Sequence, residues 1–301
     1  MGKVVAAIFT THVPRLMILD PAARKAYMGR HVTTFYDAMP SLERERLRDL
    51  DFDTFVLIDT HWFTTIEYVL NAHERLSGVY TSDELPAMLH DHHYDFPGDS
   101  DLARGIEDEA RERGIRALAA AHRNLPLHYP TLNVMHYLNP GARRRVLSIG
   151  VCQTASVKND LLFGAAIGQA IWKSTRRVVL VASGGLSHRF WDYDHILEHA
   201  SASPDDITST ANRLYDERIM DWFRAGHHAE VIAAADDYRA HCSPEGRFSH
   251  YLIVAGAMGA DRWNWRGEQF GQYEAALGTG QAIFFFQPRV GDVVETIRKV
   301  A

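Results

Sequence analysis

Four short apolar runs, at residues 4–9, 54–59, 146–151 and 178–183, limit most strongly what this chain can fold into. Each is rich in valine, isoleucine or leucine and lacks regular alternation, which is typical of parallel strands covered on both faces. Helical patterns fall at 100–114, 161–173, 208–225 and 249–258, and further strands are expected at 66–70, 272–276 and 282–286. This order predicts an α/β fold with one mixed, largely parallel sheet and helices on both faces.

The same patterns give local expectations. We expect Ser100 to cap the first of these helices and Gly226 to end the third, with Leu214 facing the core. The chain has neither an internal repeat nor a Pro/Gly-rich linker, so we predict one domain over residues 1–288. We expect residues 289–301 to form a C-terminal tail, either helical or irregular.

Composition excludes several classes of function. The chain has 38 acidic and 32 basic residues, a formal charge of −6, and no basic run longer than residues 143–145, which argues against binding to nucleic acid. The apolar N-terminal run is too short to span a membrane and no cleavage site follows it, so we expect a cytoplasmic protein. We interpret Cys152 and Cys242 as buried thiols.

The chain has 17 histidines, and three of them directly follow predicted strands. His12, His61 and His188 come after the first, second and fourth apolar runs. Because ligands bind beyond the carboxyl ends of parallel strands, we expect these histidines to meet at one sheet edge. Asp59 precedes His61 closely enough either to orient its ring or to cap a turn.

Two histidines and one carboxylate form the ligand set of non-haem iron(II) oxygenases. Glu245 lies between Pro244 and Gly246 in an irregular segment before a predicted helix, which suits an inward-facing carboxylate. The pattern alone leaves several other acids as candidates.

At these residues the chain resembles the class III (LigB-type) extradiol ring-cleavage dioxygenases, especially members that act on 3,4-dihydroxyphenylacetate. The matching segments run in family order: THVP at 11–14, DTHW at 59–62, GVYTSDELP at 78–86, SGGLSHRF at 183–190, EG at 245–246 and GTGQ at 278–281. The ordered set, rather than any single segment, carries the resemblance.

The resemblance implies a LigB-like three-layer α/β/α fold with one iron(II) bound by His12, His61 and Glu245. It makes His188 the acid/base residue and places His128 near the substrate hydroxyls. Residues 127–130 read LHYP here, whereas many members have Asp-His-Gly, which puts the role of His128 in question.

The implied reaction opens the ring of a catecholic aromatic acid beside its diol, using O2. The substrate would be 3,4-dihydroxyphenylacetate or a related lignin-derived catechol. We also expect a homo-oligomer, either a dimer or a tetramer. Two alternatives remain: a zinc-dependent hydrolase or lyase on the same scaffold, and a non-catalytic binding relative.

Other unusual residues have simpler structural explanations. The histidine-rich stretch at 90–93 is expected to be a solvated loop, and residues 227–228 to interact favourably with the dipole at a helix end. Arg15, Arg189 and Arg247 flank proposed site residues and are candidates either for binding a substrate carboxylate or for surface salt bridges. The glycines at 278 and 280 suggest a tight turn between strands.

Overall fold

The computed structural model describes residues 1–18, 22 and 33–288, so the predicted tail at 289–301 lies outside the described residues. All four apolar runs form strands of one sheet, and the predicted α/β class is confirmed. The strands of this sheet are β1 (Lys3–Thr10), β2 (Thr54–Thr64), β3 (Tyr68–Asn71), β6 (Ala117–Ala120), β7 (Arg145–Cys152), β8 (Arg177–Ser183), β9 (Gly267–Gln269) and β12 (Ile283–Phe286).

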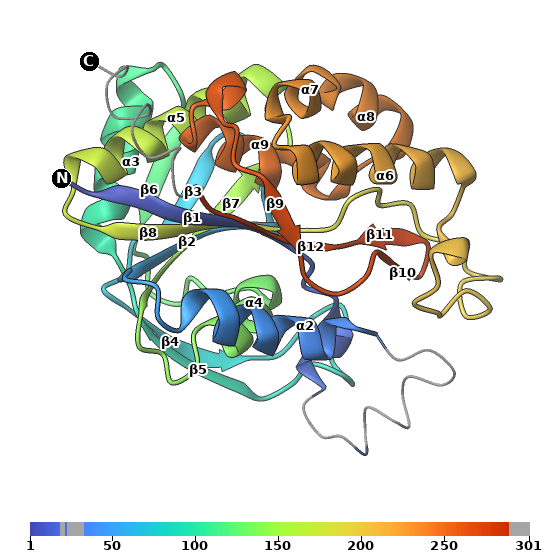
Figure 1. Cartoon of the computed structure of the whole chain (residues 1–301). Coiled ribbons are helices and arrows are strands. Elements are labelled where there is room, and N and C mark those ends of the chain that lie inside the picture. Colours follow the sequence, from blue (N-terminus) through green and yellow to red (C-terminus); the bar gives the residue numbers. More distant parts are fainter. Residues whose placement is uncertain (19–21, 23–32, 289–301) are drawn as a thin grey trace.

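The sheet has the order β6-β3-β7-β2-β8-β1-β12-β9. Its centre is parallel, since β2 pairs with β7 and β8, and β8 pairs with β1. Antiparallel pairs lie toward the edges, where β12 joins β1 and β9, and β3 joins β7. The carboxyl ends of β1, β2 and β8 therefore meet at one edge, as the sequence predicts (Figure 1).

Helices cover both faces of the sheet. They are α2 (Phe35–Leu42), α3 (Ser100–Glu112), α4 (Tyr129–Leu138), α5 (Val157–Lys173), α6 (Thr210–Ala225), α7 (His228–Ala233), α8 (Ala235–Cys242) and α9 (Ser249–Ala257). Short turns of helix are η1 (Pro14–Met17), η2 (Glu43–Leu47), η3 (Pro204–Asp206), η4 (Glu245–Phe248) and η5 (Ala260–Arg262). Two small hairpins complete the structure: β4 (Arg75–Tyr80) with β5 (His92–Pro97), and β10 (Glu274–Ala276) with β11 (Thr279–Gln281).

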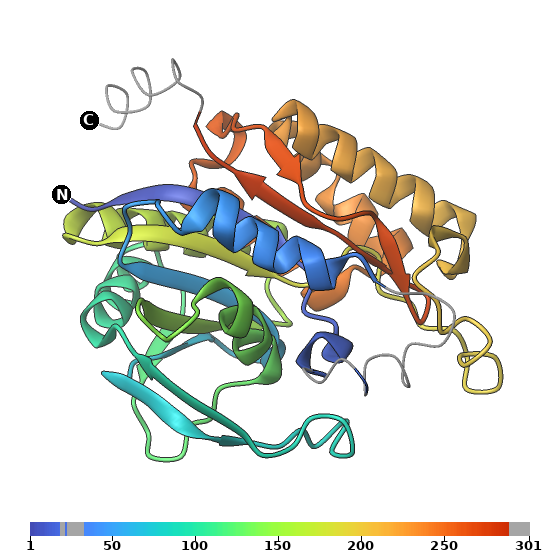
Figure 2. The same ribbon diagram turned by 60° about the horizontal axis from the view of Figure 1, so that its bottom comes forward.

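The two faces of the sheet bury separate apolar cores. One core packs α3, α5 and α9 against the sheet together with α6 to α8, and the other packs η1, α2 and α4 (Figure 1). In Figure 2 the layer with α2 and α4 faces the viewer, and the β4–β5 hairpin lies on the side of α4 that is away from α2. Both faces of the central strands are thus covered, which explains why their sequences show no alternation. Among the described residues, no helix combines the length and apolarity needed to cross a membrane.

Several local expectations need correction. The N-cap of α3 is Asp99, whose side chain accepts a hydrogen bond from Leu102 N, whereas Ser100 is already helical. Leu214 is 58% exposed because it lies on the outer face of α6. Gly226 does end α6, in the left-handed conformation. The strand expected at 272–276 is β10, in a hairpin separate from the main sheet.

Candidate metal centre

Three predicted ligands converge at the carboxyl edge of the sheet. Nε2 of His12 lies 3.0 Å from Oε1 of Glu245, and Nε2 of His61 lies 3.6 Å from the same oxygen. One ligand atom from each residue lies within 4.8 Å of the others. His12 and Glu245 are buried and His61 is partly buried. Two imidazoles and a carboxylate facing one point suit a single divalent transition metal that retains open coordination positions.

Two neighbouring side chains hold His12, which lies just beyond the end of β1. Its Nδ1 lies 2.9 Å from the hydroxyl oxygen of Ser183 at the end of the neighbouring β8, so Nε2 is the nitrogen that faces the centre. The side-chain amide of Asn133 in α4 donates to the carbonyl of His12 at 2.8 Å. A second partner for each ligating imidazole is usual in metal sites because it fixes the ring's orientation.

His61 is presented by an irregularity inside β2. The pairing of β2 with β7 moves from Asp59 opposite Gly150 directly to Phe63 opposite Val151, so the three intervening residues leave the ladder. Bulges of this kind re-aim side chains near functional sites. Asp59 accepts hydrogen bonds from the backbone N–H groups of His61 and Trp62 at 3.0 and 3.2 Å. Of the two roles considered for Asp59, the structure shows the turn-capping one.

Glu245 is held by an unusual backbone. Ser243, Gly246, Arg247 and Phe248 all have positive φ, a conformation that costs free energy for side-chain-bearing residues and is concentrated at functional sites. The carboxylate accepts hydrogen bonds from the Thr60 hydroxyl and from Gly185 N, each at 2.5 Å. The segment is therefore shaped to aim one carboxylate into the sheet edge.

The protonation states suit metal binding. Burial raises the pKa of Glu245, but attraction to His12 and the hydrogen bond with it outweigh this and hold the pKa well below its usual range. Burial and the neighbouring His12 lower the pKa of His61 to about 4. Burial also lowers the pKa of His12, yet the Glu245 carboxylate raises it overall, so a metal would displace a proton there. Metals bind deprotonated ligands, and at neutral pH Glu245 and His61 are already in that form.

His188 joins the cluster from the loop after β8. Its Nδ1 lies 3.6 Å from Oε2 of Glu245 and makes no hydrogen bond within the described residues. Burial lowers its pKa, so the imidazole is neutral. The ring thus stands beside the three ligands with an unused nitrogen atom.

His128 and Tyr129 arrive together at the start of α4. The His128 ring packs against Trp62, with centroids 5.9 Å apart. The Tyr129 hydroxyl, in contrast, lies 2.7 Å from Nε2 of His61. The closest polar contact from this segment therefore comes from Tyr129, an aromatic residue near the motifs that could frame a substrate but that the sequence did not predict to contact a ligand candidate. The one indication in the sequence was that Tyr129 directly follows His128, in the LHYP segment at 127–130 that differs from the expected pattern.

Some secondary expectations fail. His228 is fully buried at the amino-terminal end of α7 and stacks on Trp263 with centroids 3.5 Å apart, so it is a core residue and does not have the favourable dipole interaction expected of it. His92 and His93 belong to β5, whereas His90 is exposed as predicted.

The flanking arginines and the cysteines can also be placed. Arg189 and Arg247 are exposed, while Arg15 is half-buried and donates to the carbonyl of Ala275 at 3.1 Å. The prediction of buried free thiols at Cys152 and Cys242 is confirmed.

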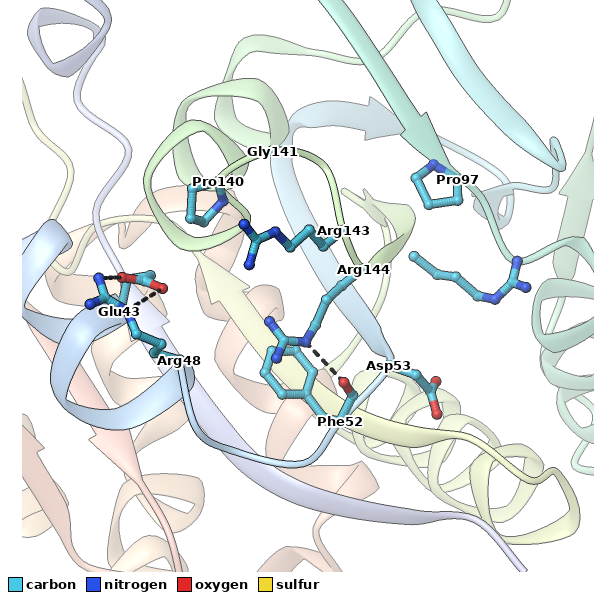
Figure 3. Close-up of a pocket in the computed structure, with 10 residues that line it drawn as sticks. Glu43, Arg48, Phe52, Asp53, Pro97, Pro140, Gly141, Arg143 and Arg144 are labelled. Atoms are coloured by element: carbon cyan, nitrogen blue, oxygen red, sulfur yellow. Dashed lines mark hydrogen bonds and ion pairs between the residues drawn. The ribbon is translucent and has the colours of Figure 1, made fainter.

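A cavity of about 730 Å³ lies at the opposite, amino-terminal edge of the sheet (Figure 3). Three of its four arginines have local partners: Arg48 pairs with Glu43 at 2.8 Å, Arg144 donates to the carbonyl of Phe52 at 2.9 Å, and Arg145 donates to the carbonyl of Gly98 at 3.0 Å. None of the three proposed ligands lines this cavity. The candidate metal centre at the carboxyl edge is therefore separate from this cavity.

Comparison with known proteins agrees with this centre. The family model described as the catalytic LigB subunit of aromatic ring-opening dioxygenase matches residues 6–286 of this chain. The chain belongs to this family, whose dioxygenases are oxidoreductases.

Two relatives carry specific activities in their names. The chain is 32% identical over 265 residues to 3,4-dihydroxyphenylacetate 2,3-dioxygenase of Escherichia coli, covering 88% of this chain and 93% of that one. It is 24% identical over 252 residues to the 2-aminophenol 1,6-dioxygenase beta subunit of Pseudomonas sp, covering 80% and 79%. The crystal structure of an uncharacterized Escherichia coli K12 protein shares the fold, with a TM-score of 0.60 and 16% identity, over 93% of this chain and 99% of that chain.

Proposed function

We propose that this protein opens the ring of a catecholic aromatic acid beside its two hydroxyls, using O2 and one iron(II) bound by His12, His61 and Glu245. The observation that carries the proposal is the convergence of these three side chains on one point at the sheet edge. Membership of the LigB family supports the reaction class. The zinc-dependent alternative uses the same ligands but would consume no oxygen.

The residues around the centre have separate tasks in this proposal. Iron(II), when bound, would make the ring hydroxyls more acidic and bring the ring and O2 together. His188 is neutral and has a free nitrogen, so it can accept a proton from a ring hydroxyl and return it as the ring opens. His128 would lie near the substrate hydroxyls. Thr60 and Gly185 hold the Glu245 carboxylate in place.

The substrate's carboxylate needs a cationic partner, because an unpaired charge in a dry site costs several kcal/mol. Among the three flanking arginines we propose Arg15. It follows His12 closely in η1, it is half-buried, and the carbonyl of Ala275 fixes its guanidinium at 3.1 Å. Arg189 and Arg247 are exposed and serve as comparisons.

A substrate panel tests the reaction. Protein loaded anaerobically with iron(II) is mixed with 3,4-dihydroxyphenylacetate, protocatechuate, 3-O-methylgallate, catechol or 2-aminophenol, while oxygen uptake and the yellow ring-opened product are followed. We expect equal molar amounts of oxygen consumed and product formed with a carboxylated catechol. Activity that needs zinc and consumes no oxygen would establish the hydrolase or lyase alternative instead.

The same panel tests Arg15. Arg15→Gln should raise KM for the carboxylated catechols by roughly tenfold or more, the loss expected for a charged hydrogen bond, and leave catechol unaffected. Arg189→Gln and Arg247→Gln should leave both unchanged. If wild-type protein cleaves uncharged catechol as well as the acids, no arginine binds a substrate carboxylate here.

A further inference from the structure

A second buried carboxylate, Asp216 of α6, lies outside the metal-binding set. It is fully buried and accepts four hydrogen bonds. Oδ1 receives them from Ser187 N at 3.0 Å and Tyr238 OH at 2.6 Å, and Oδ2 from Ser187 Oγ at 2.7 Å and Tyr273 OH at 2.6 Å. Burial raises the pKa of Asp216 to about 6, although the four hydrogen bonds lower it in part. At neutral pH it is therefore a carboxylate, the form that can accept four donors.

Ser187, the residue that precedes His188, donates two of these hydrogen bonds. The backbone of this segment is also bonded to β11, where Gly280 N donates to Ser187 O and Leu186 N donates to Gly280 O, each at 2.8 Å. Gly280 allows the carboxylate to approach, since a Cβ there would lie 2.0 Å from Oδ2 of Asp216. Asp216 thus ties α6, α8 and the β10–β11 hairpin to the segment that carries His188.

The His188 side chain has few restraints of its own. Its buried Nδ1 makes no hydrogen bond within the described residues, and its ring contacts Phe190 edge-on at 5.1 Å. Its backbone N–H donates to the carbonyl of Cys242 at 3.3 Å. The position of the imidazole beside Glu245 therefore depends on the backbone that Asp216 holds.

We propose that Asp216 is a positioning residue, which holds the Ser187–His188 segment so that the His188 imidazole stays in place beside Glu245 during turnover. The inference rests on the acid/base role of His188 in the proposed function. Asn cannot replace the carboxylate. Its NH2 group is a hydrogen-bond donor and would face two of the four donors that the carboxylate accepts from. Even a displacement of about 1 Å of a catalytic group costs roughly 10²-fold in rate.

The test compares Asp216→Asn with Asp99→Asn. Asp99 is equally buried (2% exposed) and pairs with Arg176 at 2.7 Å, but it lies at the opposite edge of the sheet. For Asp216→Asn we expect kcat to fall roughly 10- to 100-fold, while iron content and the anaerobic Kd for 4-nitrocatechol stay within about twofold of wild type. Asp99→Asn should lower the melting temperature and leave kcat unchanged.

Two milder variants keep the test decisive if Asp216→Asn does not fold. Tyr273→Phe and Ser187→Ala each remove one hydrogen bond to Asp216, and each should lower kcat several-fold without changing Kd. If these variants, or a folded Asp216→Asn, lower only the melting temperature, Asp216 is structural and the proposal is wrong.

A measurement without turnover separates this inference from the proposed reaction. In zinc-loaded full-length protein, the ¹⁵N resonances of His188, assigned from their absence in His188→Phe, should shift or broaden in Asp216→Asn and remain unchanged in Asp99→Asn. This outcome would support the positioning role even if no catechol is cleaved. Unchanged His188 resonances in Asp216→Asn would overturn it.

Discussion

The hydroxyl of Tyr129 lies 2.7 Å from Nε2 of His61, the same ring nitrogen that faces Glu245. A metal bound by His61 must therefore displace this hydrogen bond. Tyr129 directly follows His128 in the LHYP segment at 127–130.

Tyr129→Phe should consequently bind metal more tightly. A hydrogen bond contributes about 0.5–1.5 kcal/mol net, so its removal should lower the Kd for a divalent metal by roughly two- to tenfold. Calorimetric titration with Zn²⁺ and anaerobic titration with Fe²⁺ measure the change. Weaker binding in the variant would instead make the phenol oxygen a ligand.

Replacement of Glu245 by alanine should abolish metal retention. The carboxylate is the one anionic member of the proposed ligand set, and it is ionised because His12 holds its pKa well below the usual range. A bound metal stabilises the folded protein by mass action. Addition of iron(II) should raise the melting temperature of wild-type protein but not of Glu245→Ala. Full iron occupancy in the variant would remove Glu245 from the ligand set.

His188→Phe should separate catalysis from metal binding. The ring contacts Glu245 at 3.6 Å but is not part of the converging set of ligand atoms. We expect iron and anaerobic catechol binding to be retained while kcat falls by roughly 10²–10⁴, the usual contribution of a positioned acid/base. Loss of iron from this variant would instead place His188 among the ligands.

Gly246→Ala should disturb the metal centre through the backbone. A Cβ there would lie 2.5 Å from Cγ2 of Thr60, the residue whose hydroxyl donates to Glu245. Metal affinity should fall by roughly 10- to 100-fold, as for other groups that orient a ligand. Gly114→Ala is the matched control, since Gly114 also has positive φ but has nothing within 4 Å of the added carbon. It should cost only roughly 1–2 kcal/mol of stability and leave metal binding intact.

His228 should make stability pH-dependent. Burial lowers its pKa to about 4, whereas the unfolded chain titrates near 6.5. Between these values the unfolded chain binds a proton that the folded protein does not, so the free energy of unfolding falls as the pH decreases. The loss from this group between pH 7 and pH 5 is about 2 kcal/mol.

Urea unfolding of metal-free protein at several pH values measures this effect. His228→Gln should be less stable at pH 7 but show a flatter decline toward pH 5. The exposed neighbour provides the control, because His227→Gln should keep the wild-type slope. An unchanged slope in His228→Gln would mean that other buried groups cause the acid sensitivity.

The sequence was informative wherever a local pattern has one physical meaning. Short unbroken apolar runs rich in valine and isoleucine are typical of strands covered on both faces, so the central sheet and the edge that receives His12, His61 and His188 could be predicted. Helix ends were less certain, because neighbouring residues compete for the cap, as Asp99 and Ser100 do. Glu245 could not be chosen from spacing, since four nearby residues with positive φ aim it inward and no local pattern encodes that path.

What the sequence by itself determined was the α/β class, the sheet edge and, through ordered motifs, the family and a candidate ligand set. The tertiary structure alone decided which polar groups surround those ligands. The Tyr129 hydroxyl at His61 and the Asp216 carboxylate behind His188 join residues 68 and 29 positions apart in the chain. Contacts over such separations are fixed by how helices pack on the sheet, which depends on the combined burial of many side chains rather than on any one segment.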